Sequence, residues 1–390
     1  MSFLRNRAVN LLNLHYGISA FALNGGGLFI AVFLLRAGVA IPTILAAQAL
    51  IVGMRFVIRP SVLVLGKRFG LKPLTILGTV LCGLQYPVLA EVHGVGLTLL
   101  LFCIVGGIGD TLYWTCYHAY FASLGDLHHR GHQIGAREAL ASIAGIAGPL
   151  AAGWTLVGYG PRVAFGMTAA VQVVSALPLF GTANVAVADS APGAFRAAFR
   201  GVLLFAADGW IAATYVIVWQ IALFLTLGES YSGFGAAMAL AALVGAIGGL
   251  LLGRHIDTGH GARATWLALA ALSATIVLRA ASTRHAPLAV IANACGALTG
   301  NLYAATTMTV IYNQAKSSPC PLRFHVATEG GWDLGCAAGC LTAALLSLTG
   351  APLSIGILLS LAGVIPLFVL LQRHYTDSLP APEMAVLKSR

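Results

Sequence analysis

The chain has 390 residues, of which 58% are hydrophobic and only 9% are charged, and its mean hydropathy is +0.88. A soluble domain carries about a quarter charged residues, so this composition excludes a soluble globular protein. The net charge of +10 does not indicate a nucleic-acid partner, because the Lys and Arg residues lie between apolar runs, where they act as topology signals.

Twelve apolar runs are long enough to cross the ~30 Å of hydrocarbon in a bilayer. In chain order they cover residues 9–35, 41–64, 73–91, 96–123, 136–158, 162–182, 200–227, 232–253, 264–283, 287–314, 327–349 and 352–372. The first run is too long for a cleaved signal peptide, so it is expected to be the first span. The longest connection, about residues 183–199, divides six runs from six.

The two sets of six also resemble each other in sequence. Residues 110–121 and 300–311 share a Leu-Tyr pair at an offset of 190, and the loops 67–70 and 257–260 correspond at the same offset. Such a repeat predicts two homologous bundles with a solute passing between them. We therefore expect an all-α membrane protein, with twelve transmembrane helices as two pseudo-symmetric six-helix bundles. The predicted parts are bundles at 1–185 and 200–372, a cytoplasmic linker at 186–199, and a cytoplasmic tail at 373–390.

The distribution of Lys and Arg predicts the orientation. With the N-terminus inside, the inner segments hold sixteen of these residues, and the outer loops hold four: Arg36, Arg162, Arg279 and Arg284. Positive residues favour the cytoplasmic side, so both termini are expected there, in a bacterial inner membrane. Six of the seven cysteines lie in apolar runs and none forms a CxxC pair, which predicts small buried side chains.

Twelve helices in two repeats, with charged loops after the second and eighth spans, resemble the major facilitator superfamily. Residues 253–259 (GRHIDTG), with Arg263 beyond them, match the loop signature Gly-x-x-x-Asp-Arg-x-Gly-Arg-Arg of that family. In the first repeat Leu63 and Lys67 replace its Gly and Asp. The resemblance implies a secondary transporter that alternates access by rocking two bundles and works as a monomer.

Two further segments bear on direction and coupling. Residues 145–153 (GIAGPLAAG) look like the Gly-Pro segment of exporters of that family, and close helix packing is the alternative interpretation. Residues 103–109 (CIVGGIG) lack the arginine that its proton antiporters often carry early in the fourth span.

An ionisable side chain inside the bilayer costs about 2.5–3.5 kcal/mol on insertion scales, so each one suggests a function. Asp110 lies near the middle of the fourth span, and helical spacing gives it aromatic and imidazole neighbours. Because the resemblance implies that this helix lines a central cavity, we expect these residues to bind the solute: Asp110, Tyr113, Trp114, Tyr117 and His118. A structural aromatic seam is the alternative.

In the seventh span Asp208, Tyr215 and Trp219 recur on one face. The resemblance implies that the first, fourth, seventh and tenth helices surround the pathway, which adds Asn24, Asn301 and Tyr303 as binding candidates. Asn24 precedes three glycines that weaken the first helix, so a bend or exposed backbone carbonyls are expected there. Proton coupling is assigned to Asp110, His118 or Asp208, because carboxylates and imidazoles titrate. The richer chemistry of the fourth span predicts a site that leans toward the first half.

The remaining intramembrane charges are interpreted as gating groups. Glu329 and Asp333 are expected to begin the eleventh span, where carboxylates favour a helix N-terminus. The resemblance places them against the second span and its loop, which carry Arg55, Arg59, Lys67 and Arg68. It places Asp257 against Arg137 and Glu138, so that both contacts hold an outward-open state. Snorkelling charge at the interface is the alternative.

These residues predict export of a small amphipathic or cationic compound coupled to protons. Uptake of a small metabolite or metal chelate is the alternative. The expected partners are this solute, protons and the lipid bilayer, with no nucleic acid. An intramembrane enzyme would need a nucleophile or metal constellation, and none is found in the sequence. No cofactor or metal is expected, since the histidine-rich loop at 128–132 lies off the predicted path.

Overall fold

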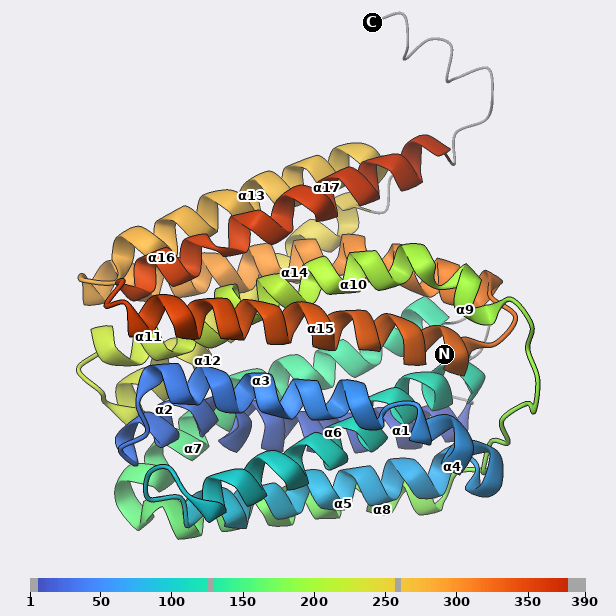
Figure 1. Cartoon of the computed structure of the whole chain (residues 1–390), viewed down its shortest axis with the longest axis horizontal. Coiled ribbons are helices and arrows are strands. Elements are labelled where there is room, and N and C mark those ends of the chain that lie inside the picture. The colour runs from blue at the N-terminus through green and yellow to red at the C-terminus, as the bar shows by residue number, and fades with distance from the viewer. Residues whose placement is uncertain (1–5, 125–129, 257–260, 378–390) are drawn as a thin grey trace, which may run out of the picture.

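The computed structural model describes residues 6–124, 130–256 and 261–377, and these residues form helices and their connections without a strand. The helices lie roughly parallel, and the described ends of the chain, in α1 and α17, lie at the same end of them (Figure 1). Ten helical segments of the described residues are long and apolar enough to cross a membrane. Large apolar side chains such as Val57, Trp154 and Leu348 remain more than 60% exposed on them, as expected of side chains that contact lipid.

In the first half of the chain, the helices are α1 (Arg7–Asn24), η2 (Gly26–Phe29), α2 (Ile30–Arg36), α3 (Ile41–Ile58), α4 (Ser61–Phe69), α5 (Leu71–Ala90), α6 (Leu97–Leu124), α7 (Arg130–Val174) and α8 (Leu177–Phe180). α5 packs along α6, and α1 packs along α7. The expected bend after Asn24 is present, since α1 stops there and a short 3₁₀ turn leads into α2. The predicted span 41–64 is interrupted at Pro60, where α4 begins.

In the second half, the helices are α9 (Ala194–Ala197), α10 (Phe199–Ile211), the π-helical η3 (Ala212–Val218), α11 (Trp219–Thr226), α12 (Tyr231–Ile256), α13 (Gly261–Ser282), α14 (Ala286–Ser317), α15 (Pro321–Leu348), α16 (Leu353–Leu358) and α17 (Ser360–Asp377). α10 packs along α15, and α12 packs along α14. Helix α17 continues five residues beyond the predicted span, to Asp377.

One helical segment holds two of the predicted spans. Residues Arg137–Phe180 form one apolar segment that is bent at Gly160, whose φ of +79° is a left-handed conformation that glycine adopts without strain. Pro161 follows and cannot continue the hydrogen-bond ladder. The predicted span 287–314 lies within α14, whose described residues include an apolar helical stretch at Ala286–Gly300. The count of twelve spans stays a prediction.

The two halves of the chain meet chiefly along two helix pairs, α7 with α12 and α3 with α15, and α6 also contacts α15. At the end away from the termini, the Phe29 ring packs edge-on against Phe234 with ring centroids 5.3 Å apart. Arg36 and Glu229, which lie close in sequence to Phe29 and Phe234 respectively, form an exposed ion pair at 3.4 Å. The exporter-like segment lies in the same region, where Gly148 and Gly235 allow α7 to approach α1 and α12 closely. This segment therefore serves close helix packing in the structure.

Candidate functional site

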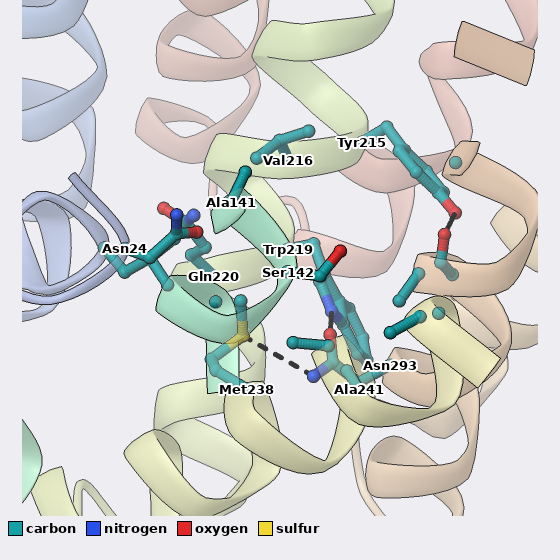
Figure 2. A pocket seen from close by; sticks show the side chains of 18 of the residues that line it. Asn24, Ala141, Ser142, Tyr215, Val216, Trp219, Gln220, Met238, Ala241 and Asn293 are labelled. Atoms are coloured by element: carbon teal, nitrogen blue, oxygen red, sulfur yellow. Dashed lines mark hydrogen bonds between the residues drawn. The ribbon is translucent and has the colours of Figure 1, made fainter. Parts of the chain in front are cut away.

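A cavity of about 400 Å³ lies between the two halves at the middle of the helices. Its wall comes from α1, η2, α7, η3, α11, α12, α13 and α14 (Figure 2). The polar or charged side chains in this wall belong to Asn24, Glu138, Ser142, Tyr215, Trp219, Gln220, Arg279 and Asn293. Only six of its twenty lining residues come from the first half, so this cavity does not lean toward the first half as expected.

Irregular helices form two parts of this wall. Asn24 is the last residue of α1, and its amide donates to the Ala20 carbonyl at 2.8 Å. On the opposite side, residues Ala212–Val218 adopt a π-helix, which widens the turn and changes which carbonyls the backbone satisfies. Tyr215 and Val216 of this π-helix line the cavity. Irregular turns of this kind occur mostly at functional positions in membrane helices.

Arg279 is a buried cation in the cavity wall, and it was wrongly assigned to an outer loop from the sequence. It lies inside α13 and is only 5% exposed. Its guanidinium carbon is 3.9 Å from the ring centroid of Tyr215 and 4.9 Å from that of Trp219, and Nη1 donates to the Tyr215 carbonyl at 2.7 Å. Gly296 of α14 makes room for it, because a Cβ there would collide with the guanidinium. The positive-inside count misses such a residue, since it treats an arginine near a predicted helix end as a loop charge.

Trp219 is fixed by Asn293, as the dashed line in Figure 2 shows. The indole Nε1 donates to Asn293 Oδ1 at 2.9 Å, and the Asn293 amide donates to the Ala237 carbonyl at 3.0 Å. Because both ends of Asn293 are engaged, the indole is held in place beside Arg279. The sequence analysis named Trp219 but not Asn293, whose only sequence signal is an amide within an apolar run.

On the other wall, Glu138 of α7 is the one acidic side chain among the described residues that line the cavity. Arg137 donates to Glu138 Oε1 from Nε at 3.0 Å and from Nη2 at 2.5 Å. The Arg137 guanidinium also lies over the rings of Tyr16 and Phe121, at 4.9 and 5.3 Å. The acid of the cavity is therefore already paired with a cation of its own helix.

A second charged cluster joins the halves outside this cavity. Arg55 of α3 and Arg59, which follows the last residue of α3, face Glu329 and Asp333 of α15, and Asp110 of α6 completes the cluster. Arg55 Nε lies 3.1 Å from Asp333 Oδ1, and Arg55 also approaches Glu329 at 3.6 Å and Asp110 at 3.7 Å. Arg59 donates to Asp333 Oδ2 from Nε at 3.0 Å and makes a second bond to it from Nη2. Arg55, Arg59 and Asp333 are all less than 10% exposed.

This cluster contains the contact expected between the second and eleventh spans, with one correction. α15 begins at Pro321, so Glu329 and Asp333 lie in its interior rather than at its N-terminus. The two guanidiniums, and not the helix dipole, therefore balance these carboxylates. Lys67 and Arg68 lie exposed in α4, and Arg68 stacks on Phe69. A gating role for all of these residues stays a prediction.

The contact predicted for Asp257 lies outside the described residues, as does the side chain of Asn301. Asp208 of α10 accepts hydrogen bonds from the Tyr303 hydroxyl and, at 2.9 Å, from Trp332 Nε1. Arg55 lies over the Trp332 ring at 5.2 Å, so the indole joins Asp208 to the charged cluster. The sequence analysis did not name Trp332.

The predicted solute-binding face of α6 divides in the structure, and none of its residues lines the cavity. The Tyr113 and Tyr117 rings stack at 5.6 Å, and Tyr117 stacks on Tyr16 of α1 at 5.5 Å. Tyr113 also bonds to His15 of α1 at 3.1 Å. These two tyrosines therefore join α6 to α1 in a buried aromatic seam, which was the alternative interpretation.

Trp114 and His118 point toward the charged cluster instead. Their rings stack at 5.7 Å, and the His118 ring stacks on His325 of α15 at 5.8 Å. His118 Nε2 lies 3.9 Å from Glu329 Oε1. Asp110 thus belongs to the charged cluster and His118 adjoins it, and neither residue lines the cavity. Among the described residues, no group of three potential ligands could hold a metal ion.

Comparison with known proteins places the chain in a family. Its sequence matches the Major Facilitator Superfamily over residues 61–323, and the chain belongs to that superfamily. The fold is similar to the crystal structure of the human organic anion transporter MFSD10 (TETRAN), with a TM-score of 0.69 and 17% identity over 94% of this chain and 99% of that one. It is also similar to the crystal structure of a POT family transporter in complex with 5-aminolevulinic acid, with a TM-score of 0.70 and 9% identity over 94% and 95% of the two chains.

No curated protein sequence matches the chain. The family and the two similar structures make the protein a multi-pass membrane protein with the fold of a secondary transporter, and they point to transport rather than catalysis.

Proposed function

We propose that this protein moves a small amphipathic solute across the membrane by alternating access, with the solute in the cavity between the two halves. The observation that carries the proposal is the cavity itself, which is lined from both halves at the middle of the helices. Secondary transporters bind substrate at this depth, between two repeats and beside interrupted helices. The bend after Asn24 and the π-helix beside Tyr215 are such interruptions.

The proposal includes twelve spans in two six-helix bundles. The ten apolar segments include one that is bent at Gly160 and counts as two, and α14 adds another, which brings the number of spans to twelve. The sequence repeat supports two paired bundles, because its matched tyrosines make equivalent contacts. Tyr113 bonds to His15 of α1, and Tyr303 bonds to Asp208 of α10. The cytoplasmic location of both termini rests on the bias of Lys and Arg.

For coupling, we propose that protons bind in the region of Asp110, His118 and Asp208. The cluster and Asp208 together hold four carboxylates but only two guanidiniums, from Arg55 and Arg59. An excess of buried negative charge is offset most simply by a proton on one of these carboxylates, and its release would add negative charge to this region. Export rests on the likeness of residues 145–153 to the exporter segment of the family.

The experiment uses inside-out vesicles with an imposed pH gradient and a panel of labelled anionic, neutral and cationic amphipathic compounds. Accumulation inside these vesicles that stops when the gradient is dissipated is the expected result. Accumulation by right-side-out vesicles alone would establish uptake instead of export. No gradient-driven movement of any compound in either orientation would refute the proposed transport.

Asp208→Asn tests the coupling. The amide keeps an acceptor for Tyr303 or Trp332 but cannot bind a proton, so gradient-driven accumulation should disappear while solute exchange across the vesicle membrane continues. Asp189→Asn is the matched control, because Asp189 is exposed in the linker. Unchanged accumulation by Asp208→Asn would remove Asp208 from the proton path.

A further inference from the structure

Arg279 is a buried cation without an acidic partner among the described residues. The groups that face it are the rings of Tyr215 and Trp219, at 3.9 and 4.9 Å, and the Tyr215 carbonyl at 2.7 Å. Its Nε is buried and has no hydrogen-bond partner. Burying a charge is costly unless it is paired and hydrogen-bonded. Two aromatic faces and one carbonyl offset part of this cost and leave the positive charge uncompensated.

The nearest acidic candidate does not supply the missing charge. Glu138 lines the same cavity from α7, but Arg137 of the same helix already binds it through two nitrogens. Glu138 is also about half exposed, whereas the Arg279 side chain is enclosed. The cavity therefore presents one net positive charge, set between two aromatic rings, in a space that suits a small organic molecule.

We propose that Arg279 binds the carboxylate of a small solute with a flat apolar body, and that Tyr215 and Trp219 flank this contact. The planar guanidinium matches a carboxylate by geometry as well as by charge, and the unused Nε supplies a donor. A single carboxylate balances a single guanidinium, so the solute is a monocarboxylate. This inference rests on the proposed function and replaces the cationic solute expected from the sequence.

The experiment measures binding by calorimetry to the full chain in lipid nanodiscs, with three probes of one shape: benzoate, benzamide and benzylammonium. Benzoate is expected to bind at least about tenfold more tightly than the other two. Arg279→Met should weaken benzoate binding about 10- to 100-fold and leave benzamide unchanged, because a charge-assisted hydrogen bond is lost. Arg279→Lys should retain part of the preference, since it keeps the charge but not the planar fork.

Arg36→Gln is the matched control, because it removes an exposed arginine at the end of the molecule and should leave all three affinities unchanged. If benzoate binds no better than benzamide or benzylammonium, or if Arg279→Met keeps the preference for benzoate, the proposal is wrong. If Arg279→Met does not fold, Arg279→Lys provides the test. Benzoate affinity and preference for benzoate that equal those of the unaltered protein would show that the planar guanidinium is not used, and the proposal would be wrong.

The vesicle panel separates this inference from the proposed function. Movement of neutral or cationic compounds that does not depend on Arg279 would refute the carboxylate site while leaving a transporter. No movement of any compound by the unaltered protein, together with Arg279-dependent binding of benzoate, would refute transport and leave a carboxylate-binding site.

Discussion

Replacing Arg59 by glutamine should destabilise the protein more than any single change to a carboxylate of the charged cluster. The cluster holds two guanidiniums, of Arg55 and Arg59, and three carboxylates, of Asp110, Glu329 and Asp333, so its formal charge is 2 − 3 = −1. Arg59→Gln makes it 1 − 3 = −2, whereas Asp333→Asn makes it 2 − 2 = 0. The first change therefore adds repulsion, and the second removes it.

The magnitude follows from the burial and the distances. Arg59 is 1% exposed and lies 3.0 Å from Asp333 Oδ2 through Nε, with Thr115 accepting from Nη1 at 2.5 Å. Two unit charges about 4 Å apart interact by about 4 kcal/mol at an effective dielectric constant of about 20. In other proteins, removing one partner of a buried ion pair lowers the free energy of unfolding by about 3–5 kcal/mol. We therefore expect Arg59→Gln to lower the free energy of unfolding by about 3–5 kcal/mol.

The assay is reversible unfolding by SDS in mixed micelles, followed by tryptophan fluorescence. Adding Glu329→Gln to Arg59→Gln restores a formal charge of −1 and should recover part of the loss. The loss should also be smaller at acidic than at alkaline pH, because a proton can then neutralise the excess carboxylate. Arg36→Gln, which breaks an exposed pair, should cost about 0–1 kcal/mol. An Arg59→Gln cost as small as this control, or a deeper loss on adding Glu329→Gln, would refute the charge balance described for the cluster.

Two glycine substitutions test close approaches in the structure. Gly296→Ala places a methyl group against the Arg279 guanidinium and should weaken benzoate binding about tenfold. Gly166→Ala, in open space on α7 and away from the cavity, should leave benzoate binding unchanged. Equal calorimetric affinities of the two variants would contradict the placement of Arg279. Gly335→Ala places a methyl group against the Ala206 carbonyl where α15 crosses α10, and overpacking should lower the free energy of unfolding by about 1–3 kcal/mol. An unchanged SDS midpoint would show that the two helices do not pack this closely.

Much of the fold follows from local sequence. Apolar runs predict the helices because each segment must satisfy its own backbone hydrogen bonds in lipid, whatever its neighbours are. The bend after Asn24 was predicted from the glycines that follow it, and the contact of Arg55 with Glu329 and Asp333 from the family resemblance. The start of α15 was misplaced by six residues, because Arg323 and His325 lowered the local hydropathy although both are buried in the helix.

The sequence by itself determined that this chain spans a membrane many times and that its apolar runs at 41–64 and 327–349 carry charge. Only the tertiary structure decided which of these charges meet, and that Arg279 of α13 and Glu138 of α7 line the cavity. Arg279 is close to Tyr215 because of the way α13 and α14 pack against the π-helix η3. Gly296 of α14 leaves space for the guanidinium there. Helical spacing gives the face on which a side chain lies, but the neighbour of that face depends on packing between distant segments, which local spacing does not record.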